Sequence, residues 1–365
     1  METSSPKVTD KRLIGYDGAV NFIPYYTTDV WSADGSYFIF YSCRDGRISL
    51  NRYYPDADRY ETILDMAAWT PTFAAKADPY AAFVVSGHAR NSETVLLPCD
   101  NRLCHVSIPG KSMRVSQAEF PGDAMLSGPF HVSDDGRYLT GVEYRRGEAA
   151  PEKTTIFVYD IAREAVVFRK AFAFWANHPQ FFRDSGRILF CHEGKTEGIP
   201  DRLHLLEWEK NVHYSIYPQR HNDRGEQSEC IGHEMPAGDK VIAVRYPVSK
   251  MPDCGIILVD PQTKAGQLLD HDDYLHVASD AAGSRFVMDT CWWGNTTRKA
   301  VNQSDVILFD DRMKTKTLLA TVCCEMKNQI YHVHPRLNPA GDIVLCTAKE
   351  SECSDRAKIL FMRVG

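Results

Sequence analysis

The sequence has no long hydrophobic run and little helical patterning. No stretch of about 18 consecutive apolar residues occurs, and the N-terminal segment METSSPKVTDKR lacks the apolar core of a secretory signal. We therefore expect a cytoplasmic protein without a membrane contact. Apolar residues are rarely spaced as in an amphipathic helix, and residues 60–68 are the one modest helical candidate.

The chain also lacks a positive charge excess and paired cysteine motifs. Its formal net charge is -6, so no basic field is present for nucleic acid or anionic lipid, and local Arg and Lys must meet any anionic substrate. The 11 cysteines are scattered through apolar runs without C-x-x-C spacing. This usage indicates reduced core thiols, as expected in the cytoplasm.

What is present is a repeated unit, in which a turn signal precedes a β-rich run. The chain of 365 residues is 44% hydrophobic and 25% charged, an ordinary globular composition. The first copy is Asp34-Gly35 before residues 37–43, and the second turn residues of all copies stand at 35, 79, 136, 186, 239, 284 and 341. This spacing is close to the roughly 40–50 residues of a four-stranded propeller blade.

Seven such units predict an all-β protein, folded as a single seven-bladed β-propeller over residues 1–365. Most turns are followed by two further β-rich runs, and with the strand ahead of the turn this gives four strands per unit. The last unit ends after its third strand at 358–364, and residues 12–16 at the N-terminus are left over. We expect this N-terminal strand to join the last blade, which closes the ring and removes exposed edges.

Five histidines occupy the same place in five units. In a propeller the strand before such a turn is the innermost one, and its first residues open onto one mouth of the central channel. A single histidine there could tie two blades together, whereas five converging imidazoles indicate a shared cation or substrate. Each lies five to eight residues ahead of its turn: His131, His178, His233, His276 and His334.

Other side chains fall at the same predicted mouth. His192 ends the second strand of the fourth unit and Arg202 begins its third strand, so both can face the histidines. Arg202 could instead form a surface ion pair with Asp201 or Glu193. The adjacent tryptophans 292 and 293 follow the second strand of the sixth unit, where they could stack on sugar rings or be buried between blades.

The segment 329–335 has the strongest metal-binding pattern. Side chains two apart in a strand share a face, so His332 and His334 should point the same way, and Gln329 can reach them from the preceding bend. A bare H-x-H also fits two half-exposed strand histidines. Imidazoles with an amide oxygen and no thiolate suit Mn²⁺ or another divalent cation better than a structural zinc.

The order of these motifs resembles that of the oligogalacturonate lyases, which are seven-bladed propellers with TolB-like repeats. The resemblance covers the last four blades well and the first two only as generic repeats. It implies a manganese ion held by His276, Gln329, His332 and His334, with His233 and Arg202 as catalytic residues. The matching motifs are His-Pro-Gln (178–180), Cys-His-Glu-Gly (191–194), Asp-Arg (201–202), Gly-His-Glu (232–234), His276 and Gln-x-x-His-x-His-Pro (329–335).

Several positions depart from the family pattern. Lys195 replaces an expected proline, Met235-Pro236 replaces an aromatic pair, and residues 288–291 replace a glycine-rich turn. The implied metal ligands are intact, while residues expected around them differ. These departures therefore bear on which sugar is bound more than on which reaction is catalysed. The side chains expected to contact substrate are His131, His178, His192, Lys195, Trp292 and Trp293.

The implied reaction is β-elimination on a uronic acid within an acidic oligosaccharide. Removal of the C5 proton builds charge on the adjacent carboxylate, which the metal and Arg202 can neutralise. Neutral His233 would be the base, and the C4 oxygen would leave to give a 4,5-unsaturated uronate. Arg202 could also take part in proton transfer, although a guanidinium is a poor simple base.

Other interpretations compete with this one. A related propeller lyase could act on a different uronate, such as a glucuronate-containing oligosaccharide. A non-catalytic propeller could bind a protein partner over the same mouth, and bound metal in the purified protein would discriminate the two. A serine-peptidase propeller is disfavoured, because no G-x-S-x-G motif occurs. The sequence does not indicate an oligomeric state.

Overall fold

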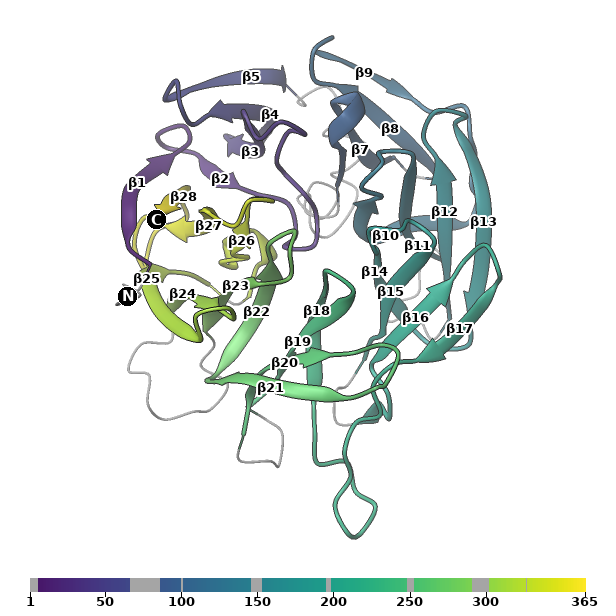
Figure 1. The fold of residues 1–365 in the computed structure, drawn as a ribbon. Helices are drawn as coiled ribbons and strands as arrows, with labels where there is room; N and C mark the ends of the chain where they lie inside the picture. Colours follow the sequence, from purple (N-terminus) through teal and green to yellow (C-terminus); the bar gives the residue numbers. More distant parts are fainter. Residues whose placement is uncertain are drawn as a thin grey trace. The chain divides into compact units, whose positions relative to one another are not determined.

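A computed structural model describes residues 6–65, 86–99, 101–145, 153–194, 198–247, 253–290, 302–325 and 327–365. The chain divides into two compact units. The first comprises residues 1–15, 194–204 and 214–365, and the second comprises residues 16–193 and 205–213. In the described ranges the regular structure is β-strand, with short 3-10 turns and no α-helix (Figure 1). The predicted all-β class is confirmed.

The strands of the first unit form three sets of four within the described residues. Two sets are antiparallel meanders, and the third adds the N-terminal strand to the last strand of the chain. The sets are β18 (Ile231–Ala237), β19 (Lys240–Arg245), β20 (Gly255–Val259) and β21 (Gly266–His271); β22 (Tyr274–Ser279), β23 (Arg285–Thr290), β24 (Gln303–Asp310) and β25 (Thr315–Cys323); and β26 (Arg336–Leu337), β27 (Ile343–Lys349), β28 (Ala357–Val364) and β1 (Val8–Ile14).

The second unit repeats the same four-strand arrangement. Its sets are β2 (Val20–Phe22), β3 (Phe38–Arg44), β4 (Arg47–Tyr54) and β5 (Arg59–Asp65); β6 (Gly87–Ala89), β7 (Thr94–Cys99), β8 (Arg102–Ser107) and β9 (Ser112–Val115); and β10 (Ala124–Val132), β11 (Tyr138–Arg145), β12 (Thr154–Asp160) and β13 (Ala165–Phe172). A further set, most of whose residues belong to this unit, is β14 (Ala176–Phe181), β15 (Arg187–His192), β16 (Leu203–Glu207) and β17 (Val212–Ser215).

The predicted turns close hairpins between the first and second strands of the sets. Ser32 Oγ donates to Asp34 Oδ1 at 2.7 Å, and Ser133 makes the same contact with Asp135 at 2.6 Å. Gly35 adopts φ 72, a left-handed conformation that glycine reaches without strain. This chemistry is local, so the turns were visible in the sequence.

One local prediction is wrong, and another is not tested. The helical candidate at 60–68 contains the end of strand β5, because pairing such as Tyr53 with Tyr60 on β4 outweighs its weak helical pattern. The second predicted turn, at 78–79, lies outside the described residues and stays a prediction. The β6–β7 hairpin turns at Arg90–Ser92, which the sequence did not mark. That turn ends on Glu93 in the left-handed region, so no glycine or proline marks it.

Buried clusters between neighbouring sets form the core of each unit. In the first unit Val244 of β19 and Val277 of β22 belong to one such cluster. In the second unit Val142 of β11 and Phe190 of β15 belong to another. This packing places β22 against both β18 and β26, and β10 against β14. The first strands of adjacent sets are therefore neighbours, as the alignment of the histidines requires.

The described residues also bear on membrane-spanning helices and cysteine usage. No helix there is both long enough and apolar enough to cross a bilayer. The ten cysteines in those ranges are free thiols, and seven of them are buried. Most therefore lie in the core, as predicted.

The N-terminal strand pairs as predicted with the last strand of the chain. The antiparallel register runs from Val8 opposite Val364 to Ile14 opposite Ile359. Beyond the strand end, Lys358 Nζ donates to the carbonyl of Gly15 at 2.8 Å. β1 thus covers the edge of β28.

Deleting residues 6–14 should sharply destabilise the protein, because β28 loses a whole row of hydrogen-bond partners and becomes an exposed edge. A loss of a few kcal/mol would lower the melting temperature by roughly 5–10 °C, measured by calorimetry. Leu13 is 66% exposed on the same strand, so Leu13→Ser is the control and should melt like the parent. A deletion variant with unchanged melting and solubility would contradict the role given to β1.

Candidate metal centre

Three buried histidines of the first unit converge on one point. One ring nitrogen from each of His276, His332 and His334 lies within 4.8 Å of the others. The ring centroids of His276 and His334 are 4.6 Å apart, and those of His332 and His334 are 5.3 Å apart. Their exposed fractions are 0%, 7% and 2%. Three imidazoles in this arrangement fit the donor set of a divalent transition-metal ion.

His276 is oriented by a carboxylate on the neighbouring strand. Its Nδ1–H donates to Asp289 Oδ2 at 2.9 Å, and its backbone N–H donates to Asp289 Oδ1 at 2.8 Å. Both residues are almost fully buried. With Nδ1 held in this way, Nε2 is the nitrogen available to a cation, as in carboxylate–histidine–metal triads. Asp289 was not singled out from the sequence, because its pairing with His276 depends on the register of β22 and β23.

The convergence of His332 and His334 has a different cause from the one predicted. Residues 329–331 form a 3-10 turn, and the strand begins only at Arg336. His334 lies between them with φ 43, in the left-handed region. The expected strand is therefore wrong for this segment, and an irregular backbone rather than strand alternation brings the two rings together.

Gln329 begins the 3-10 turn ahead of the two histidines. Its side chain is exposed, and its carbonyl accepts the backbone N–H of His332 at 3.3 Å. Its use as a fourth metal ligand stays a prediction.

The electrostatics of the cluster favour the uncharged form of one ring, His334. Burial lowers the pKa of His334 well below 6.5, and the neighbouring His276 and His332 lower it further. His334 is therefore neutral near pH 7. A neutral imidazole has the lone pair that metal binding requires.

His233 lies against this cluster on β18. Its ring centroid is 4.3 Å from that of His276, and its Nδ1 lies 2.6 Å from the hydroxyl of Tyr246. A β-bulge falls between Gly232 and Glu234, and His233 adopts φ 43. A Cβ at Gly232 would collide with the Tyr246 ring. The glycine of the Gly-His-Glu motif therefore leaves room for the tyrosine that contacts His233.

Arg202 forms a buried ion pair with the residue after His233. Its Nε lies 3.2 Å from Oε2 of Glu234, and the two residues are 3% and 0% exposed. This pair is buried, whereas the alternative considered for Arg202 was an ion pair on the surface. Glu234 was not assigned a role from the sequence, because strand alternation suggested that it points away from His233.

The other predicted site histidines belong to the second unit. Nδ1 of His131 accepts the backbone N–H of Phe181 at 3.2 Å, which ties β10 to β14. Burial lowers the pKa of His131 to about 4. The ring of His192 packs on Phe174, with centroids 4.3 Å apart. His178 is buried, with its ring centroid 5.2 Å from that of Tyr25.

The substrate contacts expected of His131, His178 and His192 stay predictions. The same holds for Lys195, Trp292 and Trp293, which lie outside the described residues.

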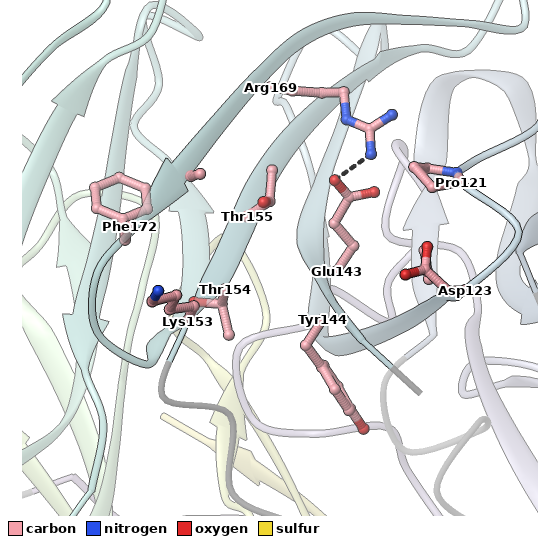
Figure 2. Close-up of a pocket in the computed structure, with 11 residues that line it drawn as sticks. Pro121, Asp123, Glu143, Tyr144, Lys153, Thr154, Thr155, Arg169 and Phe172 are labelled. Atoms are coloured by element: carbon pink, nitrogen blue, oxygen red, sulfur yellow. Dashed lines mark hydrogen bonds and ion pairs between the residues drawn. The ribbon is translucent and has the colours of Figure 1, made fainter. Parts of the chain in front are cut away.

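A cavity of about 570 Å³ opens beside β11, β12 and β13 of the second unit. Figure 2 shows the Arg169 guanidinium directed at the carboxylate of Glu143 on its wall. Burial raises the pKa of Glu143. None of the predicted site residues that the structure describes lines this cavity.

The sequence matches no protein-family model and no curated protein. Its fold is similar to that of an oligogalacturonate lyase from Vibrio parahaemolyticus, with a TM-score of 0.78 and 16% identity over 98% of each chain. It is also similar to an oligogalacturonate lyase in complex with manganese, with a TM-score of 0.76 and 16% identity over 100% of this chain and 99% of that one. The β-propeller domain of the Trilobed protease from Pyrococcus furiosus matches with a TM-score of 0.57 and 13% identity, over 95% and 96% of the two chains. The resemblance to the oligogalacturonate lyases that the motifs indicated thus extends to the fold of the whole chain.

Proposed function

We propose that this chain is a single seven-bladed β-propeller, closed by β1, that cleaves uronic-acid-containing oligosaccharides by metal-assisted β-elimination. The observation that carries the proposal is the grouping of the His276–His332–His334 cluster, His233 and the Arg202–Glu234 pair within one unit. The repeated four-strand sets and the fold similarity support the architecture. We place the enzyme in the cytoplasm, as the sequence predicts.

The residues present fit a divalent cation such as Mn²⁺. His276, His332 and His334 would hold it, with Gln329 as a further ligand. The donor set is made of imidazoles without a thiolate, which suits a borderline-to-hard ion with open positions. When bound there, such a cation supplies positive charge for the carboxylate attached to C5 of the substrate.

Arg202 would bind the same substrate carboxylate. Its Nε is held by Glu234 at 3.2 Å, which fixes the plane of the guanidinium. A planar guanidinium matches a carboxylate through two parallel hydrogen bonds. Because Arg202 is buried, the positive charge of its guanidinium acts through a low dielectric. It can therefore stabilise the negative charge that develops on the substrate in the transition state.

His233 would remove the proton from C5. If Nδ1–H donates to the Tyr246 oxygen, Nε2 carries the lone pair and can accept that proton. The electron pair of the broken C5–H bond forms the C4–C5 double bond. The C4 oxygen leaves with its own bonding pair and is protonated, which gives a 4,5-unsaturated uronate.

A panel of short oligosaccharides tests the proposal. Purified protein supplied with Mn²⁺ is mixed with oligogalacturonides, glucuronate-containing oligosaccharides or neutral oligosaccharides, and ultraviolet absorbance reports the conjugated product. We expect absorbance to grow with one uronide class and with no neutral sugar, and the uronide that reacts identifies the substrate class. A folded, metal-loaded protein that acts on no uronide would overturn the proposal.

Gly232→Ala should slow elimination without removing metal, because the new methyl group would push Tyr246 away from His233. We expect a loss of about tenfold or more, which is part of the roughly 10²–10⁴-fold that a general base contributes. Steady-state rates and metal content measure the two effects.

Tyr246→Phe is the matched variant, since it keeps the ring and removes only the hydroxyl. If Gly232 acts through Tyr246, the double variant should be no slower than the slower single variant. If the rate losses of the two single variants multiply in the double variant, Gly232 has a role that does not depend on Tyr246.

A further inference from the structure

We propose that the second unit holds another metal site, built from His178, Cys191 and Glu193, that binds a thiophilic divalent ion of the zinc class. The proposal does not depend on the lyase activity, and its ligands belong to a different unit from the histidine cluster.

The three side chains are spaced as ligands of one ion. Nε2 of His178 lies 3.8 Å from Oε2 of Glu193, and Sγ of Cys191 lies 3.7 Å from the same oxygen. One ligand atom from each residue lies within 4.8 Å of the other two. Tetrahedral zinc with bonds of about 2.0–2.3 Å separates its ligand atoms by roughly 3.3–3.6 Å. Shifts of a few tenths of an ångström would thus bring His178 and Cys191 each to a coordination spacing from Glu193.

A β-bulge brings His178 to the face that carries Cys191. Asn177 pairs directly with Cys191, so in a regular strand the next side chain would point to the opposite face. The register instead shifts between Asn177 and Gln180, and His178 adopts φ 51. Left-handed backbone at a non-glycine residue is unfavourable, and such bulges often re-aim a side chain at a functional site.

The third ligand is fixed by an extension of the same hairpin. Glu193 follows β15, and its backbone N–H donates to the carbonyl of Trp175 at 2.7 Å. Residues 191 and 193 are two apart, so their side chains share a face. All three ligand positions are therefore set by the pairing of β14 and β15 and its extension.

The burial of the group differs from ligand to ligand. His178 is 6% exposed and Cys191 is fully buried, whereas the Glu193 side chain is 20% exposed. One side of the site therefore faces solvent. Three protein ligands with an open fourth position, filled by water or a small ligand, are typical of zinc sites that are more than structural.

The donor chemistry separates this site from the histidine cluster. A thiolate favours Zn²⁺, Co²⁺ or Cd²⁺, whereas neutral imidazoles with oxygen ligands accept Mn²⁺. The two sites should therefore load with different metals. A metal on Nε2 of His178 would also take the place of the sugar contact predicted for this side chain.

Cobalt substitution of the full-length protein tests the proposal. Co²⁺ bound to a thiolate gives a sulfur-to-metal charge-transfer band in the near ultraviolet, which imidazole ligands alone do not give. We expect the band in the parent and in His332→Ala, and its loss in Cys191→Ser. Metal content after loading with Zn²⁺ should fall by one ion per chain in Cys191→Ser.

Two further variants keep the test decisive if Cys191→Ser folds poorly. Glu193→Gln alters a partly exposed side chain and should weaken Co²⁺ binding by at least about tenfold. Cys104→Ser replaces another fully buried thiol of the same unit and should keep the band. The proposal is overturned if the parent shows no thiolate band, or if the band survives Cys191→Ser. Neither readout uses lyase activity, so the two proposals can fail separately.

Discussion

Replacing His332 with alanine should abolish metal binding at the histidine cluster and remove the elimination activity with it. The variant loses one of three converging imidazoles, and even a residue that only hydrogen-bonds to a metal ligand is worth about 10–100-fold in affinity. We therefore expect metal affinity to fall by more than about 100-fold. His332 has φ -64, so alanine fits the backbone and the fold should persist.

Metal analysis after gel filtration and calorimetric titration with Mn²⁺ measure this loss. His271→Ala is the matched control, because His271 is an exposed histidine of the same unit at the end of β21. It should bind metal and react like the parent. Full metal occupancy in His332→Ala would show that the cluster is not the metal centre.

Replacing His233 with asparagine should leave the metal in place and lower the rate of elimination by about 10²–10⁴-fold, the usual contribution of a general base. His233 contacts the cluster at a ring-centroid distance of 4.3 Å from His276, yet it is not among the three converging histidines. Asparagine is preferred to alanine because His233 has φ 43, a conformation that asparagine adopts more readily than most residues.

Single-turnover rates with saturating uronide separate this effect from substrate binding. Substrate affinity should change little, because Arg202 and the metal would hold the carboxylate. A His233→Asn protein that loses its metal would make His233 a ligand rather than a base. A variant that reacts at nearly the parent rate would remove it from the chemistry.

Locally encoded features of the fold could be predicted from the sequence. Asp34-Gly35 and its copies mark hairpins because the side chains that close the turn lie within a few residues of one another. The hairpin at Arg90–Ser92 uses no glycine or proline, so the same reasoning did not find that turn. The pairing of β1 with β28 was predictable because one strand was missing at one end of the repeats and one was left over at the other.

The candidate site was predictable in its histidines and much less so in their partners. Asp289, Tyr246 and Glu234 reach His276, His233 and Arg202 across strands or between sets. Such contacts depend on register and on the position of each bulge, which residue spacing alone does not reveal. The function of Gly232 was hidden for the same reason, since it depends on where the Tyr246 ring lies.

The left-handed backbone shared by His178, His233 and His334 also constrains which residues can replace these histidines. For most residues this conformation costs roughly 1–2 kcal/mol, which is a factor of about 5–30 in the ratio of folded to unfolded protein. A randomised library sorted only for folding should therefore become enriched in glycine and asparagine at all three positions, with β-branched residues depleted. Histidine should dominate only when the sort also demands bound metal or turnover. The mutational record of these positions would then distinguish selection on the backbone from selection on the imidazole.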